Sequence, residues 1–141
     1  MKAINLLEKY PESCRIIQEW FTKEFSKSMG EDDSVPEDFK EMVLQEGFTK
    51  ERLAIIIDAN PRSLFDVFDE NEIYIVMGVI DDKEAKPLFH YHLHGLSDNN
   101  DMFKSRKEAE FTGIILAFEE LENKQKVELT TINKEIEDET K

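Results

Sequence analysis

The sequence lacks several features that identify whole classes of protein. Its 141 residues include one cysteine, Cys14, so neither an internal disulfide nor a cysteine-based zinc site is available. No stretch of about 18 apolar residues occurs, which excludes a membrane-spanning helix, and the N-terminal residues show no signal-peptide pattern. The five glycines are scattered and form no phosphate-binding loop. We therefore expect a cytoplasmic protein that has no membrane partner.

Positive charge is also scarce. Lys and Arg number 18 against 32 Asp and Glu, which gives a formal net charge of −14. A field of this sign opposes binding to nucleic acid, because phosphate contacts depend on Lys and Arg. We expect no direct contact with nucleic acid and an unidentified protein as the partner. An alternative is an acidic inhibitor that mimics DNA toward a basic nucleic-acid-binding protein, using the acids around 31–41 and 66–72.

The first half of the chain has helical periodicity. Apolar side chains three and four residues apart predict a helix over 12–29, and Gly30 is expected to end it in the left-handed conformation. Ser34 is expected to cap a helix that runs to about residue 46 and buries Phe39. Further helix caps are expected at Thr49, Asn60 and Ser105. These signals indicate a compact helical subunit before residue 70.

From residue 72 onward the periodicity alternates. Residues 73–80 are apolar on both faces, which is typical of a central or well-covered strand. Residues 87–94 alternate strictly, and a polar turn separates the two segments, so they predict an antiparallel hairpin. The face expected to be buried carries Phe89, Tyr91 and Leu93. Because a two-stranded hairpin is marginally stable alone, it must pack on a helix or find a third strand.

An amphipathic helix from Ser105 to about Lys124 is expected to cover the hairpin. Residues 127–132 alternate again, and we expect either a third strand or an extended tail there, followed by a mobile charged tail. The expected fold class is α+β, in which N-terminal helices precede an antiparallel β-hairpin packed against a long C-terminal helix. Residues 1–126 are expected to form one domain.

The histidines form the sharpest chemical pattern. His90, His92 and His94 share one face of a strand, with neighbouring Cα atoms about 6.7 Å apart. Two adjacent imidazoles at this spacing can bind one zinc or another divalent metal ion, with Asp98 or Asp101 as a further ligand. The simpler interpretation is that the histidines form the solvated reverse side of the hairpin. No catalytic motif accompanies them, so we expect no catalytic residues and a non-enzymatic interaction or regulatory protein, with metal binding as an alternative.

Two segments resemble parts of known proteins. They are Asn60 to Asp66, which leads into a strand, and Ser105 to Glu110, which opens a helix that closes with Phe118 to Glu122. Both are similar to segments of small uncharacterised proteins encoded by prophages and other mobile elements of gut bacteria. The resemblance covers about residues 36–124. It implies a bacterial cytoplasmic accessory protein that acts on a host-encoded or element-encoded partner, and it assigns no catalytic residue.

Overall fold

The computed structural model describes residues 2–81, 87–94 and 102–139. The fold is α+β, with N-terminal helices, a two-stranded antiparallel hairpin and a long C-terminal helix that packs against it. The chain divides into two compact units, residues 1–67 and 68–141. One domain over residues 1–126 stays a prediction. Within the described ranges, no helix has the length and apolar character needed to cross a membrane.

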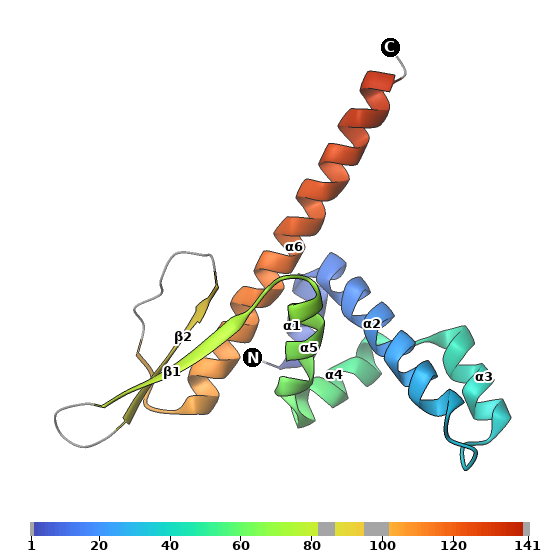
Figure 1. Cartoon of the computed structure of the whole chain (residues 1–141), viewed down its shortest axis with the longest axis horizontal. Coiled ribbons are helices and arrows are strands. Elements are labelled where there is room, and N and C mark those ends of the chain that lie inside the picture. The colour runs from blue at the N-terminus through green and yellow to red at the C-terminus, as the bar shows by residue number, and fades with distance from the viewer. Residues whose placement is uncertain (1, 82–86, 95–101, 140–141) are drawn as a thin grey trace. The chain divides into compact units, whose positions relative to one another are not determined.

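The first unit is built from helices (Figure 1). They are α1 (Ala3–Lys9), α2 (Pro11–Gly30), α3 (Glu37–Glu46), α4 (Lys50–Ala59) and the 3-10 turn η1 (Pro61–Leu64), and α5 (Phe65–Glu70) crosses into the second unit. Thr49 caps α4 as expected, because its hydroxyl oxygen accepts the N–H of Arg52. Gly47 ends α3 with φ of 65°, a conformation that glycine adopts without strain. Leu6, Ile17 and Leu53 are buried in the core of this unit.

Asn60 was expected to cap the turn after it, but its side chain makes no cap hydrogen bond to η1. Three further details of the first unit differ from the sequence expectations. Gly30 is the last residue of α2 and the chain continues right-handed after it, so the expected left-handed stop is wrong. The hydroxyl and N–H of Ser34 both donate to Asp32 Oδ1, and α3 begins after Pro36 with no side-chain cap. Phe39, expected to be buried, is 44% exposed. Ser34 therefore hydrogen-bonds within a local turn and does not cap the helix as the pattern predicted.

Replacing Ser34 separates the turn from the helix. The hydroxyl of Ser34, and then its N–H, hold the pKa of the Asp32 carboxyl below its ordinary value. Ser34→Ala is expected to raise that pKa toward the ordinary value, measured by NMR titration, and to leave the helix content unchanged by circular dichroism. A lowered carboxyl pKa stabilises the folded state at pH values above the ordinary pKa, and this stability is lost as the pH falls through the lowered pKa. The variant should therefore be less stable than the parent at neutral pH and equally stable at acidic pH, where the carboxyl is protonated in both. A shortened α3 in the variant would show that Ser34 caps the helix, and Ser28→Ala is the control.

The second unit packs one helix on one face of the hairpin (Figure 1). Strands β1 (Ile75–Asp81) and β2 (Pro87–Leu93) pair antiparallel, and α6 (Arg106–Glu139) lies against them. Tyr91 and Leu93 are buried, as expected from the alternation, whereas Phe89 of the same face is half-buried. A Cβ at Gly113 of α6 would lie 3.1 Å from Ile75 Cγ2 and 3.2 Å from Tyr91 Cδ2. Glycine therefore permits the close approach of the helix to the sheet.

Contacts at both ends of residues 106–124 fix the part of α6 that packs on the hairpin. The hydroxyl oxygen of Ser105 accepts the N–H of Glu108 at 3.3 Å, which confirms the expected cap. Further along, the buried rings of Phe118 and Phe68 meet edge to face, with centroids 5.6 Å apart. Lys124 Nζ then donates to the carbonyl of Asn71 at 3.0 Å. These contacts join α6 to the chain on both sides of the hairpin.

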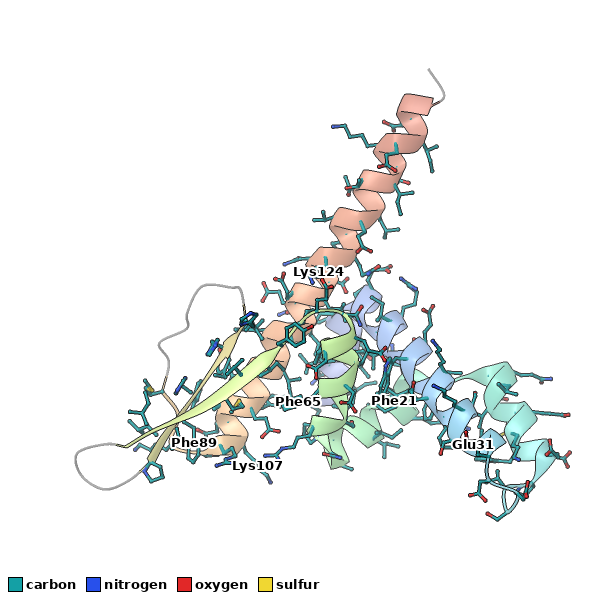
Figure 2. All side chains as sticks on the ribbon, in the orientation of Figure 1. Phe21, Glu31, Phe65, Phe89, Lys107 and Lys124 are labelled. Carbon is teal, nitrogen blue, oxygen red and sulfur yellow. The ribbon has the colours of Figure 1, made fainter. Side chains whose placement is uncertain are left out.

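The third strand or extended tail expected at 127–132 is wrong, because α6 continues to Glu139. Side chains 126–137 are all exposed, and in Figure 2 they project from the helix beyond the labelled Lys124. Helix formation is limited by nucleation, and an existing helix is extended at little cost. The hydroxyls of Thr130 and Thr131 donate to the carbonyls of Lys126 and Val127, four residues back, so these β-forming residues fit the helix. The mobility of the final residues stays a prediction.

The two parts of α6 are expected to respond differently to truncation. Phe118→Ala should lower the free energy of unfolding by about 3–5 kcal/mol, because a buried ring is lost and a cavity remains. Leu129→Ala, at a side chain that is 45% exposed, should change it by less than about 0.5 kcal/mol. Urea unfolding followed by circular dichroism measures both. Equal losses would contradict the division of α6 into a packed body and an exposed extension.

Candidate functional site

The face of the hairpin opposite α6 carries the histidines. Alternation along the two strands places six residues there in three cross-strand pairs. These residues, called the histidine face below, are Val76, Gly78 and Ile80 of β1 and Leu88, His90 and His92 of β2. Val76 is 38% exposed and Ile80 is 43% exposed, while the two histidines are half-buried. The face therefore combines accessible apolar groups with imidazoles.

Gly78 positions the imidazole of His90. The two residues are cross-strand partners, and the ring lies over Gly78 so closely that a Cβ there would overlap His90 Nε2. The His92 ring is nearly parallel to that of His90, with an interplanar angle of 11° and centroids 6.5 Å apart. The structure thus brings these two imidazoles together, as the strand pattern predicts.

The third histidine ends the row beside a tyrosine. The N–H of His94 donates to the carbonyl of Tyr74 at 2.9 Å, which continues the strand pairing by one residue. Its ring meets the Tyr74 ring nearly edge to face, with centroids 6.3 Å apart. Both residues are exposed. Tyr74 therefore extends the accessible surface of the histidine face.

Metal binding by the row stays a prediction. Within residues 2–81, 87–94 and 102–139, no three His, Cys, Asp or Glu side chains converge to hold a metal ion. Asp98 and Asp101, the predicted further ligands, lie outside the described residues. His90 and His92 alone supply two neighbouring nitrogen-bearing rings, whereas zinc sites in proteins use three or four protein ligands.

An apolar groove in the first unit was missed by sequence reasoning. It has a volume of about 300 Å³ and is lined in part by Phe25, Phe39, Met42, Val43 and Phe48. The Phe25 and Phe48 rings meet edge to face at 5.3 Å, and Phe39 remains accessible beside them. The only signal in the sequence was the number of apolar residues on 12–29 and 37–46. Periodicity placed Phe25 on the apolar stripe of 12–29 and predicted that Phe39, Met42 and Val43 are buried.

Comparisons with known proteins identify no relative of the chain, so its function is inferred from the geometry of its own surfaces. Protein-family models, curated proteins and solved structures give no match to the chain. The histidine face differs from the groove in the first unit because it is built on paired backbone strands. Paired strands fix the spacing of the side chains they present.

The placement of His90 is expected to depend on Gly78. Gly78→Ala should displace the His90 ring, since the new methyl group occupies its position, and should separate it from His92. NMR is the measurement: the His90 and His92 ring signals should shift, while those of His94 should stay unchanged. Unchanged His90 signals would contradict the position of the His90 ring over Gly78. Gly30→Ala is the matched control, because a Cβ at Gly30 meets nothing within 4 Å.

Proposed function

We propose that this chain is a non-enzymatic protein-interaction module that binds its partner on the histidine face. The observation that supports the proposal is the side of the two-stranded sheet opposite α6. One side is covered by α6, while the other presents Val76 and Ile80 to solvent beside His90 and His92. Accessible apolar groups gathered on one face are typical of surfaces that bind another protein.

The chemistry of the face indicates the kind of partner. The six residues include no Asp, Glu, Lys or Arg, although these four types make up 35% of the chain and the net charge is −14. Protein interfaces commonly have a core depleted of charge and a polar rim. We therefore propose a partner that contacts the histidine face with apolar or aromatic side chains and carries basic groups around them.

The proposed role agrees with the resemblance to proteins of mobile elements. An accessory protein of this kind acts by contact with a host-encoded or element-encoded protein in the cytoplasm. Such contact needs a recognition surface and no catalytic group. The histidine face supplies the surface from residues of one hairpin, Ile75 to Leu93.

The test compares two substitutions of exposed apolar side chains by lysine. A partner cross-linked to the full chain is identified by mass spectrometry, and its dissociation constant is then measured. Val76→Lys should weaken binding by at least about tenfold, because it places a charge in the contact. Ile55→Lys, at a side chain that is 70% exposed on α4, should leave binding unchanged. Equal affinity of both variants would reject the histidine face as the contact.

A second candidate function is inhibition of a basic nucleic-acid-binding protein. The observation that favours it is a run of exposed acids between α2 and α3 and in the first turns of α3, near the labelled Glu31 in Figure 2. These acids are Glu31, Asp32, Asp33, Glu37, Asp38 and Glu41. In the same experiment, this function predicts a basic partner, affinity that falls steeply with salt, and no effect of Val76→Lys.

A further inference from the structure

The outer edge of β1 carries backbone groups to which no described residue bonds. The N–H and carbonyl of Phe89 both bond to Phe103, at 2.8 Å each, so they point away from β1. Phe89 and Val79 therefore form a non-hydrogen-bonded pair of the ladder. By the alternation of an antiparallel ladder, the groups of Ile75, Met77 and Val79 also point away from β2. Among the described residues, nothing bonds to them.

This edge has the composition of a strand that lies inside a sheet. Residues 73–80 are uncharged and apolar on both faces, without proline. Edge strands of monomeric proteins are commonly protected by charges, prolines or bulges, because an open edge pairs with other chains. The outer edge of β2 pairs with Phe103 at Phe89, whereas no described residue pairs with the outer edge of β1, whose one charged residue, Asp81, is its last. The sequence pattern is that of a central or well-covered strand, and a further strand paired with β1 would make it central.

We propose that β1 pairs antiparallel with β1 of a second copy of this chain, about a two-fold axis at Met77. In this register Met77 faces Met77 of the partner subunit, and Ile75 exchanges hydrogen bonds with Val79 of the partner subunit. The two hairpins then form one four-stranded sheet, in which both β1 strands are central. Both α6 helices cover the same face of that sheet, because antiparallel partners in a ladder keep their side chains on matching sides.

A second copy fits this edge better than a foreign strand for two reasons. When β1 pairs antiparallel with β1 of a second copy, the outward N–H and carbonyl groups of both copies bond to each other. Such a pair has two-fold symmetry, which is the symmetry of most protein dimers. The register also places no charged side chain opposite another. Val76 faces Gly78 of the partner subunit, and Ile80 faces Tyr74 of the partner subunit. Two chains of charge −14 repel each other, so an uncharged strip is the part of the surface that permits close approach.

The first experiment uses the unmodified full chain. Sedimentation equilibrium should give twice the 16.5 kDa mass of the chain at high micromolar concentration. Hydrogen exchange by NMR should show the amides of Ile75, Met77 and Val79 becoming protected as the dimer forms. The amides of Val76 and Gly78, which bond to β2, should be protected at every concentration. A monomer throughout, or a dimer in which the three outward amides exchange freely, overturns the proposal.

The second experiment removes one outward N–H. Val79→Pro should weaken dimerisation by at least about tenfold, because each symmetric dimer loses two hydrogen bonds. The β1–β2 ladder should be retained, since the Val79 N–H does not take part in it. Val79→Ala is the matched control: it shortens the same side chain, keeps the N–H and should dimerise as the parent does. Dimerisation of the proline variant with parental affinity overturns the proposal.

The two experiments also cover a folding failure and the other proposal. If Val79→Pro unfolds, shown by loss of its near-ultraviolet circular dichroism, the exchange of the unmodified chain decides alone. The pairing uses the edge of β1 and does not rest on the proposed function, which uses the histidine face. Val79 lies outside the histidine face, so a Val79→Pro chain that is monomeric and still binds the partner of the unmodified chain separates the two.

Discussion

The second unit depends on the close packing of α6 against one face of the hairpin. A two-stranded sheet is marginally stable in water, and here Gly113 lets the helix backbone approach Ile75 and Tyr91 closely. This packing also decides what the other face presents. Because side chains alternate, burial of Tyr91 and Leu93 under α6 leaves His90 and His92 on the opposite side. One packing contact therefore determines both the stability of the hairpin and its exposed chemistry.

The hairpin and its orientation were predictable from the sequence. Strict alternation in 87–94 separates apolar from imidazole side chains, and only one of the two sets can face a helix. The caps at Thr49 and Ser105 were also predictable, since each hydroxyl stands where its oxygen accepts the backbone N–H three residues further on. The close placement of His90 on Gly78 was not. It depends on the cross-strand register, which the length of a turn alone does not settle.

The failures have local physical causes. Residues 127–132 alternate in polarity, yet Leu129 and Ile132 are also spaced as on a helix, and a short segment supports both readings. The continuing helix α6 decided between them. The Ser34 hydroxyl could accept a backbone N–H of the helix or donate to the Asp32 carboxylate, and the turn with Asp32 formed instead of the helix cap. Phe39 shows that an apolar residue at the right helical spacing needs an opposing element before it is buried.

The exposed part of α6 has a mechanical consequence. A helix rises about 1.5 Å per residue, so residues 125–139 reach roughly 22 Å from Lys124. An unstructured segment of the same length would sample many directions, whereas a continuous helix keeps its tip on a fixed heading from the hairpin. Rotation of the hairpin would swing the acidic side chains of Glu135 and Glu137 through a wide arc. A molecule that touches both the tip and the sheet would therefore meet the two at one fixed relative orientation.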